Sequence, residues 1–199
     1  MIQHYVTPLL LNGYKFDIRC YLLVNTTPEI VLYSRGYLRL TLEKYTLEDL
    51  ENPDRLFIHL TNNCFQRKHK DYKTRGDSSI AKWDLLEKEI GEERLLALEG
   101  KIKNILLLVY ASARERIENK KGFFELLGCD IIVSDLLEPY LLEVNTNPAL
   151  FLDTTVQKEV IPPVLNSTLD IALQLFAEPE SYRATCDKYS KVFDVLYDP

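Results

Sequence analysis

Three oxygen-bearing side chains have the types and spacing for metal chemistry: Asp130, Glu143 and Asn145. Asp130 interrupts the apolar run 125–133, and the other two lie two residues apart in the apolar run 140–145. Carboxylate and amide oxygens are ligands that Mg²⁺ uses, with phosphates completing its shell. The pattern leaves two interpretations open, a metal or catalytic site and a solvated pair of surface carboxylates.

The two apolar runs predict a β-hairpin that would bring these side chains together. The segment 134–139 ends in Pro139 and predicts the turn. A symmetric hairpin pairs Val133 with Tyr140, Ile132 with Leu141 and Asp130 with Glu143. Side chains alternate between the faces of a strand, so Asn145 would share their face. Opposed carboxylates repel, and a bound divalent cation would reverse that penalty.

A second group of charged residues lies on a strand predicted at 15–24. Lys15, Asp17 and Arg19 alternate with apolar residues and would share one face. This pattern suits either an exposed strand with ion pairs or a face that binds phosphate or carboxylate, with Arg19 as a forked donor. Arg39 lies on the next predicted strand, after a bend or bulge expected at Gly36. It would face either the same site or solvent.

Residues 57–63 predict a polar loop that binds a ligand, although His59 is of a type more often structural than catalytic. Residues 66–75 form the one basic cluster of an acidic chain. Such a cluster is either a solvated loop or a docking surface for an acidic partner.

Composition narrows the function classes. The chain has 199 residues, 46% hydrophobic and 27% charged, with a net charge of −6. These values predict a sizeable core and disfavour a general nucleic-acid binder. We find no run of about 18 apolar residues and no signal-peptide layout, and therefore expect no membrane span. The four cysteines are far apart, which predicts free thiols in a reducing compartment and no zinc site.

The remaining elements are predicted helices. Apolar residues recur at helical spacing from about 83 to 117. A helix over about 156–177, capped by Thr154 or Thr155, is expected to break near Pro162 and Pro163. Its expected inner stripe is Leu165, Leu169, Ile171, Ala172 and Leu175. A last helix is expected at about 182–196. The predicted fold class is α+β, an antiparallel sheet packed by helices.

Four motifs then resemble one family. KFDIRCYLLV at 15–24, SRGYLRL at 34–40, HLTNN at 59–63 and FELLGCDIIV…YLLEVNTNPAL at 124–150 look like the tubulin–tyrosine ligase-like enzymes. The resemblance covers about residues 5–176. NTNPAL, followed by Val160, Ile161, Pro162 and a Leu-rich helix, is most similar to the polyglycylase branch.

The resemblance implies an ATP-grasp amino-acid ligase. In such enzymes ATP phosphorylates a glutamate side chain or terminal carboxylate of tubulin, and a free amino acid attacks the acyl phosphate. Asp130, Glu143 and Asn145 then resemble Mg²⁺ and ATP ligands. Arg39, Glu143 and Arg19 resemble catalytic residues. The remaining residues that resemble nucleotide- and substrate-binding positions are Lys15, Asp17, His59, Thr61 and Asn62.

The chain begins almost inside the first motif. We therefore expect residues 1–199 to be the later, C-terminal lobe of an ATP-grasp domain, possibly a fragment, without most of the upstream ATP lobe. The expected reaction adds an amino acid to tubulin or another acidic protein tail. Glycine is the first candidate for this amino acid and glutamate the second. The alternatives are a non-catalytic tubulin-binding protein and an ATP-grasp ligase with another substrate. The expected protein is a cytoplasmic monomer, associated with the cytoskeleton or cilium.

Overall fold

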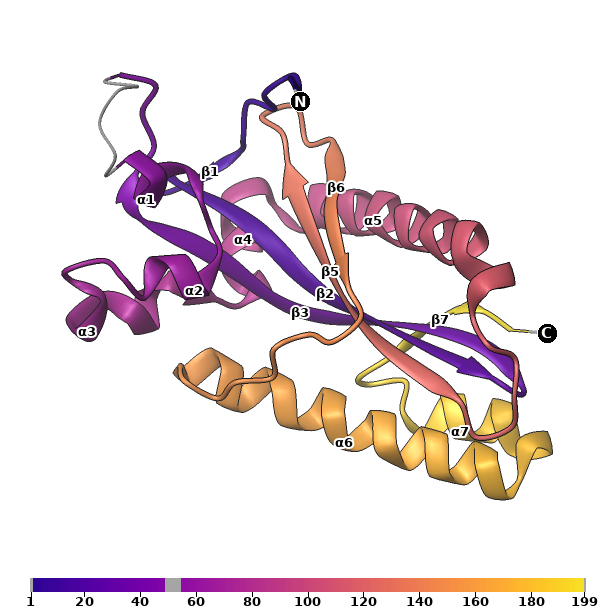
Figure 1. The fold of residues 1–199 in the computed structure, drawn as a ribbon. Coiled ribbons are helices and arrows are strands. Elements are labelled where there is room, and N and C mark those ends of the chain that lie inside the picture. The colour runs from indigo at the N-terminus through magenta and orange to yellow at the C-terminus, as the bar shows by residue number, and fades with distance from the viewer. Residues whose placement is uncertain (1, 49–54, 199) are drawn as a thin grey trace.

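A twisted antiparallel sheet carries the charged residues. The computed structural model describes residues 2–48 and 55–198. The strands follow the order β4-β3-β2-β5-β6 (Figure 1). Their bounds are β4 (Ile80–Ala81), β3 (Glu29–Lys44), β2 (Tyr14–Thr26), β5 (Phe124–Val133) and β6 (Pro139–Asn145). Short β1 (Leu10–Leu11) pairs with β2, and β7 (Asp194–Tyr197) pairs with β3. The helices and the antiparallel sheet confirm the predicted α+β class.

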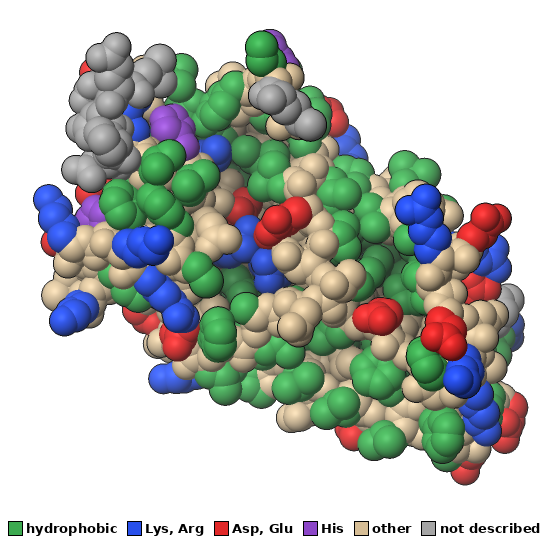
Figure 2. Space-filling model, in the orientation of Figure 1, with side chains coloured by type: hydrophobic (Ala, Val, Ile, Leu, Met, Phe, Trp, Pro, Cys, Tyr) green, Lys and Arg blue, Asp and Glu red, His purple; other side chains and the backbone are tan. Residues whose placement is uncertain are grey.

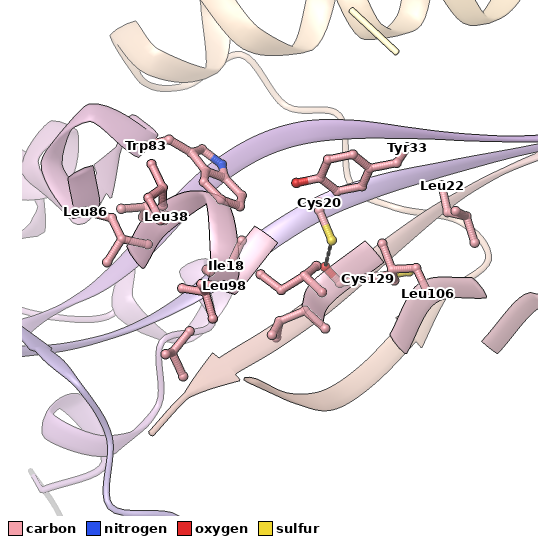
Figure 3. Close-up of a cluster of buried hydrophobic side chains, with 14 of the residues drawn as sticks. Ile18, Cys20, Leu22, Tyr33, Leu38, Trp83, Leu86, Leu98, Leu106 and Cys129 are labelled. Atoms are coloured by element: carbon pink, nitrogen blue, oxygen red, sulfur yellow. Dashed lines mark hydrogen bonds between the residues drawn. The ribbon is translucent and has the colours of Figure 1, made fainter. Parts of the chain in front are cut away.

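Helices cover both faces of this sheet, so each has its own hydrophobic cluster. On one face, α4 (Trp83–Ile90) and α5 (Glu92–Ala113) pack on β2, β3 and β5. Figure 3 shows this cluster, with Ile18, Cys20 and Leu22 of β2 beside Leu98 and Leu106 of α5. On the opposite face lies α6 (Thr155–Ala177), followed by α7 (Tyr182–Lys188) (Figure 1).

The side-chain pattern of β2 explains why one end of the sheet stays polar. One face is apolar along the strand, from Phe16 to Val24. The other begins with Lys15, Asp17 and Arg19 and becomes apolar only at Tyr21 and Leu23, where α6 packs. The three charged residues therefore lie beyond the apolar packing of α6, and the predicted alternation is confirmed.

A bulge at Gly36 sets the register of β2 beside Arg19. Arg19 pairs with Tyr37 and Cys20 pairs with Arg35, so Gly36 is the extra residue. A Cβ atom at Gly36 would lie 2.3 Å from the Arg19 carbonyl oxygen, so the close approach requires glycine. The bend predicted at this position is confirmed.

The β5–β6 hairpin confirms one predicted pair and corrects two. Asp130 pairs with Glu143 as predicted. The pairings of Val133 with Tyr140 and of Ile132 with Leu141 are wrong, because a bulge shifts the register between Asp130 and Ile131. The observed partners on the turn side are Pro139 for Val133, Tyr140 for Ile132 and Leu141 for Ile131. The extra residue of the bulge is Leu142.

The predicted helical segment 83–117 divides into α4 and α5 at Gly91, whose φ of 84° suits glycine. The cap at Thr154 is confirmed as a capping box with Gln157. The break near Pro162 and Pro163 is wrong, because α6 continues through both prolines. Pro163 is exposed and Pro162 half-buried, while the neighbouring Ile161 and Val164 anchor the helix in the core.

The phase of α6 also differs from the prediction. Leu169 is 45% exposed, and Leu165 is only half-buried, whereas Ile171, Ala172 and Leu175 face inward as expected. The buried stripe runs at three- and four-residue steps through Gln157, Ile161, Val164, Thr168, Ile171 and Leu175. The length and hydropathy of helix α6 would also suit a membrane span. In this structure 39% of its most apolar 18-residue segment is buried inside the protein.

The predicted last helix at 182–196 is partly wrong. It ends at Lys188, and the chain returns as β7 to pair with β3. Two short helices, α1 (Leu56–His59) and α2 (Asn63–Gln66), take up the two ends of the loop expected around 57–63, and a third, α3 (Tyr72–Arg75), lies within the basic cluster. The polar residues 46–55 also predict a loop, and most of it falls on residues 49–54, outside the described residues.

Candidate active site

Two arginines and two aspartates form a buried alternating network at the polar end of the sheet. Arg19 Nε donates to Asp130 Oδ1 at 2.5 Å, and its second nitrogen donates to Oδ2 at 3.1 Å. Arg39 binds the same carboxylate at 2.7 Å and binds both oxygens of Asp17, at 2.6 and 2.7 Å. These four side chains are buried on three adjacent strands. The network brings together residues far apart in the sequence, and of the two positions left open for Arg39 it is the one beside Arg19 and Asp130 that is observed.

Electrostatics keep these groups charged. Burial alone would raise the pKa of Asp130, but hydrogen bonds from Arg19 and the charge of Arg39 outweigh it and hold the pKa below its ordinary value. Burial likewise opposes the charge of both guanidinium groups, yet Asp130 raises the pKa of Arg19, and Asp17 together with Asp130 raises the pKa of Arg39. A buried ion pair with several good hydrogen bonds is an orienting device more than a source of stability.

Glu143 and Asn145 border the network from the edge strand β6. Glu143 is exposed, and its carboxylate accepts a hydrogen bond from Asn145 Nδ2 at 3.1 Å. The amide oxygen of Asn145 therefore points away from that bond. The prediction that Asp130, Glu143 and Asn145 lie together is supported by the pairing of Asp130 with Glu143. Their role as metal ligands stays a prediction.

Residues around α1 close the other side of the site. Thr61 Oγ1 donates a hydrogen bond to Asp17 and so connects the link between α1 and α2 to the network. Burial lowers the pKa of Lys15, against the opposing charge of Asp17. Asn62 caps α2 by accepting from the Cys64 amide at 2.8 Å. Within the described residues His59 makes no hydrogen bond to the network, and its Nδ1 instead lies beside the Tyr5 hydroxyl.

These residues line a cavity of about 310 Å³. Figure 2 shows charged side chains within a hollow near the middle of the visible face. The lining comprises predicted residues Lys15, Asp17, Arg39, His59, Thr61, Asn62, Asp130 and Glu143, with Leu60, Ile132 and Leu142 between them. The apolar members are residues that sequence analysis missed. Arg19 lies behind Asp130 in the network, and Asn145 beside Glu143.

The basic cluster lies next to this cavity, where Glu43 and His69 hold it in place. His69 Nε2 lies 2.9 Å from Glu43 Oε1, and its Nδ1 accepts from the Asp71 amide at 3.1 Å. Both ring nitrogens are thus used within the protein. The side chains of Arg67, Lys68, Lys70 and Lys73 are exposed. The cluster is therefore an ordered surface with its cations outward.

The donor set fits Mg²⁺ with a nucleotide triphosphate. The Asp130 carboxylate makes three of the roughly four hydrogen bonds that such a group can accept. The exposed Glu143 carboxylate accepts a hydrogen bond from Asn145. Mg²⁺ is usually held by one or two carboxylates plus substrate phosphates, and Lys15 and Arg39 of the cavity lining would supply positive charge for such phosphates.

Comparison with known proteins tests the family resemblance of the four motifs. The profile of the Tubulin-tyrosine ligase family matches residues 1–181. The chain belongs to the tubulin-tyrosine ligase family. The resemblance of its four motifs is thereby confirmed.

Similar proteins in the family carry several activities in their names. The chain is 38% identical to "Protein polyglycylase TTLL10" of Macaca fascicularis, over 88% of this chain and 30% of that protein. It is 36% identical to "Inactive polyglycylase TTLL10" of Homo sapiens, over 88% of this chain and 28% of that protein. It is 30% identical to "Probable alpha-tubulin polyglutamylase Ttll1" of Tetrahymena thermophila, over 100% of this chain and 50% of that protein. The chain thus spans half or less of the length of these relatives.

Proposed function

We propose that this chain is the C-terminal catalytic lobe of an ATP-grasp ligase that adds an amino acid to tubulin or a similarly acidic protein. Glycine is the first candidate, because polyglycylases are among its relatives. The carrying observation is the buried network of Arg19, Arg39, Asp17 and Asp130 beside the cavity. A reaction that moves a phosphoryl group needs such fixed charges more than it needs a nucleophile.

The proposed reaction has two balanced steps. A glutamate carboxylate oxygen of the acceptor protein attacks the γ-phosphorus of ATP, and the bond to the leaving ADP breaks. The amino group of glycine then attacks the acyl carbon, the bond to phosphate breaks, and the nitrogen loses a proton. The product is an isopeptide bond, with ADP and inorganic phosphate released.

The side chains of this chain contribute position and charge. Arg39 and Arg19 stabilise negative charge on the transferring group, because their donors are already oriented by Asp17 and Asp130. Thr61 holds Asp17 and thereby fixes the direction of Arg39. Asp130, Glu143 and Asn145 would hold Mg²⁺, which neutralises phosphate charge when bound.

The basic cluster suits the protein substrate. Its four exposed cations lie on the turns between α2 and α3 (Arg67, Lys68 and Lys70) and on α3 (Lys73). Arg67 also contacts the Phe151 ring and forms an ion pair with Asp153, on the segment that leads into α6. An acidic polypeptide tail would be attracted to this surface and guided toward the cavity. The proposal therefore places the enzyme on microtubules, in the cytoplasm or a cilium.

An incorporation assay tests this function. We expect labelled glycine to enter tubulin when the chain, Mg²⁺ and ATP are present, and the signal to be lost with Glu143→Gln. Parallel reactions with labelled glutamate and tyrosine identify the amino acid. Incorporation that Glu143→Gln leaves unchanged would contradict the assigned site.

A second candidate is a non-catalytic tubulin-binding protein. It is favoured by one relative whose name includes "Inactive polyglycylase". A chain that binds both tubulin and Mg²⁺-ATP but incorporates no amino acid would support this second function.

A further inference from the structure

A tyrosine near the start of the chain bridges two cavity residues. Lys15 Nζ lies 3.3 Å from the Tyr5 hydroxyl oxygen, and that oxygen lies 3.1 Å from His59 Nδ1. The Tyr5 ring meets the His59 ring edge-on with centroids 6.0 Å apart, and the Lys15 ammonium lies 5.1 Å from the Tyr5 ring centroid. Tyr5 therefore contacts β2 and α1 together.

The hydrogen-bonding groups of Lys15, Tyr5 and His59 favour one placement of the protons among them. A lysine ammonium can only donate, so the Tyr5 oxygen accepts from Lys15. Burial and the neighbouring Tyr45 raise the pKa of Tyr5, so its phenol keeps its proton. His59 Nδ1 lies close enough to accept a hydrogen bond from that phenol O–H. A neutral imidazole whose Nδ1 accepts carries its own proton on Nε2.

The state of His59 agrees with this arrangement. Burial, with the charges of Lys15 and Arg55, lowers the pKa of His59 and favours the neutral ring. Its Nε2 is buried and makes no hydrogen bond within the part of the chain that the structure describes. An unpaired buried donor costs free energy, so a ligand oxygen that accepts from it would be favoured.

We propose that Tyr5 is a positioning residue of the site: its hydroxyl links Lys15 to His59 Nδ1 and holds His59 in the neutral tautomer with the proton on Nε2. His59 then offers a hydrogen-bond donor to an anionic or carbonyl oxygen, and does not serve as a proton acceptor at Nε2. The consequence for ligand binding rests on the proposed function, whereas the tautomer itself does not.

Nitrogen NMR on the folded 199-residue chain tests the proposal without a ligand. Long-range proton–nitrogen correlations separate protonated from unprotonated ring nitrogens, and His59→Asn assigns the signal among the three histidines. In the wild type we expect a single tautomer, with Nδ1 unprotonated and Nε2 protonated. In Tyr5→Phe the ring packing remains while the hydroxyl is lost, so the two nitrogen signals should move toward each other as both tautomers become populated.

Tyr189→Phe is the matched control, because it removes a tyrosine hydrogen bond of 3.2 Å to Asp170, far from His59 in the sequence and on other elements. It should leave the His59 signals unchanged. A wild-type chain with the proton on Nδ1, or a Tyr5→Phe chain that keeps the wild-type tautomer, would overturn the proposal. Failure to bind nucleotide would count against the proposed function alone, because the tautomer is measured without nucleotide.

Discussion

Replacing Asp130 by Asn removes the charge that two arginines share. In the folded protein Arg19 would lose the Asp130 carboxylate, its ion-pair partner among the described residues, while Arg39 would keep Asp17. The side chains of Arg19 and Asp130 are only 7% and 1% exposed, so water would compensate little. Removing one partner of a buried ion pair lowers the free energy of unfolding by about 3–5 kcal/mol. Because Asn keeps an oxygen that can still accept from Arg19, we expect a loss at the lower end, about 3 kcal/mol.

Urea unfolding at pH 7 measures this loss. With a slope of about 2–3 kcal/mol per molar urea, the midpoint of Asp130→Asn should fall by about 1–1.5 M. Glu143→Gln is the matched control, because Glu143 is an exposed carboxylate opposite Asp130 in the hairpin. Its effect should stay within about 0.5 kcal/mol. Equal midpoints for wild type and Asp130→Asn would refute the reasoning that Arg19 depends on this buried carboxylate.

The same substitution changes the acid limb of the stability curve. The pKa of Asp130 is lower in the folded than in the unfolded chain, where an aspartate titrates near about 3.9. Its contribution to stability is therefore complete above that pH and is lost as the pH falls toward the folded pKa. The difference in free energy of unfolding between wild type and Asp130→Asn, measured by urea unfolding at several pH values, should be constant near neutrality and shrink below about pH 4.

Two further predictions concern the bulge and the basic cluster. Gly36→Ala should destabilise the fold by about 1–3 kcal/mol, since its Cβ would approach the Arg19 carbonyl oxygen at 2.3 Å. Thermal unfolding measures this loss of stability. Gly100→Ala is the control, because a Cβ at that position meets nothing within 4 Å. A Gly36→Ala chain more stable than the wild type would contradict the assigned bulge. Replacing Lys68, Lys70 and Lys73 by Ala should weaken binding to an acidic peptide, most at low salt. In the matched control, Lys88, Lys158 and Lys191 are replaced by Ala, and the affinity for the acidic peptide should stay unchanged. Equal losses of affinity in the two triple variants would refute a specific docking surface.

Much of the site was predictable from strand alternation. Lys15, Asp17 and Arg19 share a face because successive side chains alternate, and Asp130 meets Glu143 because the hairpin is nearly symmetric. What alternation cannot predict is a bulge, which depends on how the whole sheet twists. The extra residue in β6 shifted every pair on the turn side of Asp130.

Helix phase and remote contacts were less predictable. Leucine favours the core, yet Leu169 and Leu173 of α6 are exposed, because Ile161, Val164 and Ile171 fix the phase against the sheet. Tyr5 precedes every strand, and no local pattern relates its hydroxyl to Lys15 or His59. Only the folded chain brings these segments together.

Calorimetric titration of the 199-residue chain with Mg²⁺-ATP tests most directly the claim that the polar end of the sheet is a metal–nucleotide site. We predict saturable binding by the wild type and its loss in Glu143→Gln, while circular dichroism shows both proteins equally folded. Binding that persists in Glu143→Gln, or a folded wild-type chain that binds no nucleotide, would contradict the account.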